Sequence, residues 1–228
     1  MNKKSSISNT TRRKLFIGNN LFIFVMTAIM VTITLVFGSV ASQKDNLPFA
    51  YWQHIATFTI LSNIFLGIVA LISVIIGIKH FSKPLPHRLN VLYLVASTSA
   101  MLTFLTVVCY LAPSRAFQGK NMFDMLTGPM LFLHFLDPII SAITYVFLLD
   151  GPKTTKKEKL FTLIPPGLYA IPYALLIVIL KVVPDFYGLT FGGRYYLSLL
   201  VVAVFGIITY GIASFLTFMR NRRISKNN

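Results

Sequence analysis

Two ionisable side chains stand apart in this sequence because they fall deep inside a long apolar run. They are His134 and Asp137, whereas the other acids and histidines fall in loops or near the ends of apolar runs. An ionisable group inside a bilayer costs on the order of 3 kcal/mol unless it faces protein or water, so each one marks a candidate functional site. The two residues are three positions apart and would share one face of a helix.

A second polar cluster, made of hydroxyl and amide groups, lies in an earlier apolar run. Its members are Thr59, Ser62 and Asn63. A hydroxyl becomes a good nucleophile when a base within hydrogen-bonding reach accepts its proton, and histidine is the usual base. Thr59 as nucleophile and His134 as base would form a minimal catalytic dyad. Asn63 or Asp137 would then orient the imidazole or polarise a carbonyl group.

Two other interpretations of these polar residues remain open. Ser, Thr and Asn commonly join membrane helices through hydrogen bonds, so the residues also fit a non-catalytic membrane scaffold. His134 and Asp137 fit the proton relay of a small transporter or proton-coupled carrier, although the other apolar runs carry no further deep ionisable group to extend it. One deep histidine and one deep carboxylate are too few for a typical metal site, and we expect neither a metal nor another cofactor.

The elements that must position these residues are apolar segments of membrane-spanning length. The chain has 228 residues, of which 55% are hydrophobic and 12% charged, whereas soluble domains carry about a quarter charged residues. A helix needs about 20 residues to cross the hydrocarbon layer, and helices satisfy their own backbone groups there. The sequence therefore predicts an all-α fold with six transmembrane helices, over residues 15–40, 50–79, 89–112, 124–149, 160–183 and 194–219.

The distribution of basic residues predicts the orientation of these helices. Most of the 21 Lys and Arg fall in the two tails and in the second and fourth loops, and such loops face the cytoplasm. We therefore expect both termini to be cytoplasmic, in a multi-pass protein of the cell membrane. The net charge of +15 fits contact with anionic lipid headgroups, and no motif indicates nucleic-acid binding. The predicted parts are a polar tail over residues 1–12, a transmembrane domain over 13–221 and a basic tail over 222–228.

The second and fourth predicted helices run in the same direction, so depth can be compared between them. Thr59 and His134 would then lie in one layer, in the half of the membrane away from the termini. Asn63 and Asp137 would lie together about one turn deeper. Two polar rows at matching depths predict a single site.

At these two motifs the sequence resembles a known family. Phe58-Thr59-Ile60-Leu61-Ser62-Asn63 is similar to the Phe-Thr-x-x-Ser-Asn signature of bacterial relatives of the androgen-induced-protein family. Leu133-His134 with Pro138 four residues after the histidine is similar to the family's second motif. The resemblance implies six membrane helices and an intramembrane threonine and histidine that hydrolyse fatty acid esters of hydroxy fatty acids. Asp137 has no counterpart in the pattern, and the animal members lack the Ser-Asn extension.

Together these features predict an intramembrane hydrolase of lipid esters. Thr59 and His134 would be catalytic, and Ser62, Asn63 and Asp137 would form a supporting polar site. The expected partners are membrane lipids and a lipid ester substrate that enters laterally. The carrier and the scaffold are the alternatives.

Overall fold

The computed structural model describes residues 8–43, 55, 57–180 and 191–227, and all the regular secondary structure in these ranges is helical. Six of the helices are long and apolar enough to cross a membrane. They are Asn9–Val36, Phe58–Lys79, His87–Phe117, Pro129–Leu148, Lys156–Leu176 and Tyr196–Ser225. The all-α, six-helix prediction is confirmed at this level.

Several of these spans consist of consecutive α-, π- and 3-10-helical segments. Spans one, two and six are single α-helices, α1 (Asn9–Gln43), α2 (Phe58–Lys79) and α9 (Tyr195–Asn227). Span three comprises α3 (His87–Thr106), η1 (Val107–Leu111) and α4 (Ala112–Phe117), and the short η2 (Met122–Leu126) follows it. Span four comprises α5 (Pro129–Leu131), η3 (Phe132–Leu136), α6 (Asp137–Ile143) and η4 (Thr144–Leu148). Span five comprises α7 (Lys156–Lys159), η5 (Leu160–Leu163), α8 (Ile164–Tyr173) and η6 (Ala174–Ile179), and η7 (Phe191–Gly193) precedes α9.

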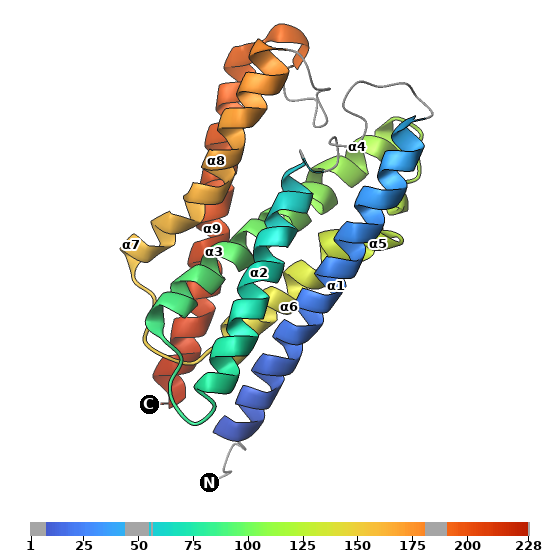
Figure 1. Cartoon of the computed structure of the whole chain (residues 1–228). Helices are drawn as coiled ribbons and strands as arrows, with labels where there is room; N and C mark the ends of the chain where they lie inside the picture. Colours follow the sequence, from blue (N-terminus) through green and yellow to red (C-terminus); the bar gives the residue numbers. More distant parts are fainter. Residues whose placement is uncertain (1–7, 44–54, 56, 181–190, 228) are drawn as a thin grey trace.

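The helices pack around α3, which lies at the centre of the bundle and contacts α2, α6 and α9. Helix α1 begins and α9 ends at the same end of the bundle (Figure 1), which we call the terminal end. Helix α8 and the adjoining part of α9 form a hairpin that leans away from α1, α2 and α4 toward the opposite end (Figure 1). Within the described residues, the helices therefore splay apart away from the terminal end (Figure 1).

The closest packing joins α1 with α2, and two glycines of α2 make it possible. A Cβ atom placed on Gly67 would lie 3.2 Å from the Thr27 methyl, and one placed on Gly77 would lie 2.9 Å from Ile17. Small residues let two membrane helices approach closely, which increases dispersion contact between their backbones. This approach also fixes where the Thr27 side chain points.

Span four departs from regular α-helix at the candidate histidine. Pro138 has no N–H group to donate to the carbonyl oxygen four residues earlier, which belongs to His134. The preceding turn, η3, is π-helical, and the Asp137 N–H donates to the carbonyl of Phe132, five residues back. Single π-helical turns are frequent at functional sites, because they displace side chains from α-helical positions.

The terminal end contains buried arginines that the sequence analysis assigned only to membrane orientation. Arg13 pairs with Asp150 at 2.7 Å. Arg220 has no exposed surface and donates to the carbonyl oxygens of Asp150 and Pro152. Helix α9 continues through the residues expected to form the basic tail, and Arg223 donates to the carbonyls of Phe147 and Leu149, at the end of span four. Residues 222–227 thus belong to α9, and α1 begins at Asn9 with residues 9–11 exposed.

Candidate functional site

Thr59 lies in the first turn of α2. This helix begins at Phe58, and the hydroxyl of Thr57 caps it by accepting from the Ile60 N–H. The prediction had started the helix at residue 50 and had placed Thr59 well inside it. Residues 50–54 and 56 lie outside the described residues, but Thr57 is extended and precedes the helix. The correct position of Thr59 is at the helix N-terminus, at the end of α2 away from the terminal end.

Asn63 links α2 directly to the segment that carries His134. Its side-chain amide donates to the Thr59 carbonyl at 2.8 Å and to the Leu133 carbonyl at 2.9 Å, and it is fully buried. Both carbonyl oxygens therefore lie within hydrogen-bonding distance of one nitrogen. This contact sets Asn63 beside the residue preceding His134, whereas the depth comparison had set it beside Asp137. The backbones that carry Thr59 and His134 approach each other here.

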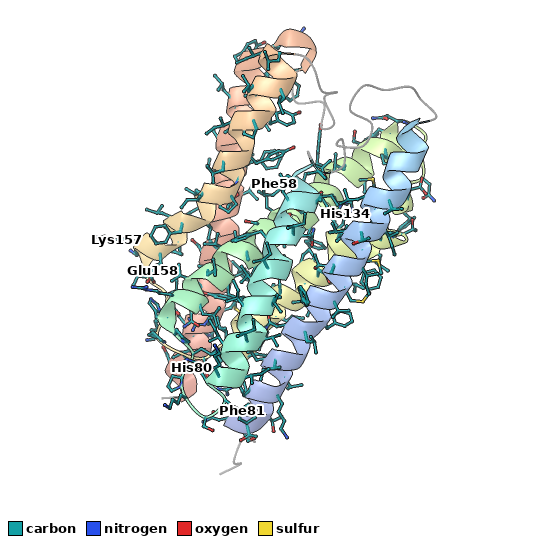
Figure 2. All side chains as sticks on the ribbon, viewed as in Figure 1. Phe58, His80, Phe81, His134, Lys157 and Glu158 are labelled. Carbon is teal, nitrogen blue, oxygen red and sulfur yellow. The ribbon has the colours of Figure 1, made fainter. Side chains whose placement is uncertain are left out.

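His134 is 4% exposed, and its Nδ1 lies 2.9 Å from the Met125 carbonyl oxygen. A carbonyl oxygen only accepts, so Nδ1 carries the proton and donates it. In a neutral ring the lone pair is then on Nε2, and no residue in the described part of the chain forms a hydrogen bond with Nε2. Because Nδ1 carries the proton, the ring has the tautomer that a general base requires. Figure 2 shows His134 and Phe58 at a similar height along the bundle.

The Thr59 side chain lies on the wall of an apolar cavity of about 500 Å³. The cavity lies between α2, span three and the α8–α9 hairpin, and its lining includes Thr103 and Thr106. The Thr59 hydroxyl forms no hydrogen bond within the described residues, and none joins it to the His134 ring. His134 is not among the described residues that line the cavity. The structure thus places Thr59 on the cavity wall and His134 in the neighbouring span.

Ser62 and Asp137 bond in other directions. The Ser62 hydroxyl lies 3.0 Å from that of Thr103 and donates to the Thr59 carbonyl at 3.1 Å, so it joins α2 to α3. Asp137 is fully buried and accepts from the Thr27 hydroxyl at 2.9 Å. The residue that orients the imidazole is Met125, through its carbonyl, and not Asp137 as one of the predicted roles had it.

Thr27 is a site residue that sequence reasoning missed. It is a threonine in an apolar helix, which by itself indicates only a local hydrogen bond, as Thr32 and Thr34 make with carbonyls of their own helix. The informative signal was Gly67, because a glycine in the middle of an apolar helix indicates close approach by another backbone.

Comparisons with known proteins assign no family to this site. No protein-family model, no curated protein and no solved structure matches the chain.

Proposed function

We propose that this protein is an intramembrane hydrolase of lipid esters, with Thr59 as nucleophile and His134 as general base. The observation that carries the proposal is the position of Thr59 on the wall of an apolar cavity of about 500 Å³. Ligand sites are typically apolar cavities with a few polar groups that fix the reacting part of the ligand. An acyl chain suits this lining.

In the proposed reaction, His134 Nε2 accepts the Thr59 proton while Oγ1 attacks the ester carbonyl carbon. The tetrahedral intermediate collapses, the alcohol leaves with the proton from His134, and an acyl-threonine remains. A water molecule activated by the same nitrogen then cleaves the acyl-threonine and releases the fatty acid. The step requires Nε2 to reach the hydroxyl directly or through one water, and such contacts often tighten only when substrate is bound.

Asn63 supports this reaction as a positioning residue. Its two hydrogen bonds hold the first turn of α2 against η3, which keeps the nucleophile and the base in one layer. The similarity of both motifs to those of the androgen-induced-protein family supports the same assignment of Thr59 and His134. The expected cytoplasmic termini and the cell-membrane location belong to this proposal, and they would place the cavity in the outer half of the membrane.

The scaffold alternative has one specific observation in its favour. Ser62, Asn63 and Asp137 each make a hydrogen bond to another span, as expected of polar residues that hold helices together. Interhelical bonding accounts for Ser62 and for one polar atom each of Asn63 and Asp137, whose Oδ1 atoms are buried without a partner among the described residues. It does not account for the Thr59 hydroxyl or for His134 Nε2, the two groups that the hydrolase needs.

Substitution of the two catalytic residues tests the hydrolase directly. We expect Thr59→Ala and His134→Ala in purified protein to abolish labelling by a fluorophosphonate probe. The rate of cleavage of long-chain fatty acid esters should fall by a factor of about 100 or more, because general-base catalysis alone contributes that much. Thr106→Ala is the matched control, because Thr106 lines the same cavity but bonds only within its own helix. Ester cleavage that survives in both dyad variants would refute the proposal, and absence of labelling and cleavage in the unsubstituted protein would favour the scaffold.

A further inference from the structure

A second hollow, larger than the cavity at Thr59, lies on the side of the bundle formed by α2, α3 and span five. It has a volume of about 760 Å³, and we call it the α2–α8 groove. Phe65 of α2, Val91 of α3 and Leu168 of α8 are typical of its lining, which is almost entirely apolar. Leu168 is 64% exposed, so the groove opens sideways.

Cationic side chains surround the α7 end of the groove. His87 and Glu158 both line this end and contact each other at 2.5 Å, so the carboxylate already has a partner. Arg88 also lines the groove, is exposed and has no partner among the described residues. Lys156 and Lys157 of α7 are exposed and lie outside the groove lining, and Figure 2 shows Lys157 beside Glu158. A negatively charged group is the natural complement of this end.

The opposite end of the groove is closed by aromatic rings. The Phe58 and Tyr169 rings lie 5.3 Å apart, and both residues line the groove as well as the cavity that contains Thr59. The two hollows therefore share this aromatic pair as a common wall. A molecule that fills the groove would have a polar, anionic end near Arg88 and an apolar end near Phe58.

We propose that the α2–α8 groove binds one anionic glycerophospholipid, with its phosphate at Arg88 and the α7 lysines and an acyl chain along α2 and α8. Basic pockets between membrane helices on the cytoplasmic side bind anionic headgroups in this way. The ester bonds of such a lipid lie next to its phosphate, at the end of the groove remote from Thr59. The bound lipid is therefore not the substrate of the proposed hydrolase, and the inference does not depend on that activity.

Lipid retention in native mass spectrometry tests this proposal. The full chain is exchanged into phosphatidylglycerol or phosphatidylcholine of identical acyl chains, and the bound fraction of each lipid is measured. We expect preferential retention of one phosphatidylglycerol molecule, and Arg88→Gln should weaken it about fivefold, which is the contribution of one basic residue near a membrane surface. Lys83→Gln is the matched control, because Lys83 is an exposed cation of the same loop region that does not line the groove. Equal retention of the two lipids, or equal retention by the wild type and Arg88→Gln, would overturn the proposal.

A second substitution tests where the acyl chain lies. Val91 is half-buried on the groove wall, so in Val91→Phe the ring enters the groove and should weaken phosphatidylglycerol retention with little change in thermal stability. Unchanged retention in this variant would show that the lipid binds outside the groove. Thr59→Ala should retain the lipid as the wild type does, which separates this site from the proposed hydrolase.

Discussion

At the scale of single residues, polar groups near the candidate site differ in their hydrogen bonds. Asn63, Ser62 and Asp137 each bond to another span, although Asn63 Oδ1 and Asp137 Oδ1 are buried without a partner in the described part of the chain. The Thr59 hydroxyl and His134 Nε2 make no hydrogen bond within the described residues. Chemistry needs groups that are held in place yet still have capacity to bond with substrate. Thr59 and His134 fit that requirement, and their neighbours supply the holding contacts.

Asn63 provides the sharpest test at this scale. Asn63→Leu keeps the volume but removes two hydrogen bonds, and we expect it to lower the free energy of unfolding by about 1 kcal/mol, since interhelical hydrogen bonds in membranes contribute roughly that amount. It should also reduce labelling of Thr59, because α2 loses its link to η3. The measurements are thermal unfolding in detergent and probe labelling. Ser73→Ala is the control, because Ser73 is also buried but bonds only within its own helix. Wild-type stability and labelling in Asn63→Leu would show that this amide does not hold the site.

At the scale of helices, composition set the number of spans but not their exact starts or regularity. The prediction of α2 from residue 50 failed because apolar composition continues upstream of Thr57, whereas the structure starts the helix at a side-chain cap. Span four was predicted from residue 124 and begins at Pro129, after Gly128 with φ of 53°. Its π-helical turn also separates the partners of His134 and Asp137, which a regular helix would have kept on one face.

The α1–α2 contact gives a prediction at the helix scale. Gly77→Ala would place a methyl group 2.9 Å from the Ile17 side chain, and overpacking of this kind costs about 1–3 kcal/mol. We expect a lower unfolding temperature in detergent. In Gly18→Ala nothing lies within 4 Å of the added methyl, so the better helix propensity of alanine should leave stability unchanged or slightly higher. The same effect in both variants would contradict the close packing of α1 and α2.

At the scale of the whole molecule, the two ends of the bundle differ in character. The terminal end is closed by Arg13, Arg220 and Arg223, which bond to the loop after span four and to the last turns of that span. The cavity at Thr59 lies toward the other end, between α2 and the α8–α9 hairpin, and the α2–α8 groove runs from Arg88 and α7 to Phe58. A rigid terminal end with a sideways-opening groove suits a protein that admits lipid from the side.

Arg220 tests the role of the terminal end. Arg220→Met removes hydrogen bonds to Asp150, Pro152 and Thr154 and leaves buried carbonyls without a donor, so we expect a loss of about 3 kcal/mol in unfolding free energy. Arg222→Met, two residues away and exposed, should be neutral. Both are measured by thermal unfolding in detergent. Equal stability of the two variants would mean that the arginines serve only to orient the chain in the membrane.

The sequence by itself determined the all-α class, the six spans and the identity of the two deep ionisable residues. These are local properties, because each apolar run must satisfy its own backbone as a helix, and a charged residue within such a run is visible without any neighbour. Only the tertiary structure decided that Asn63 meets Leu133, that Thr27 meets Asp137 and that Thr59 lines a cavity. Those outcomes depend on the rotation and register of one helix against another. Gly67, the π-helical turn before Pro138 and the buried arginines set that rotation and register through contacts between residues far apart in the chain.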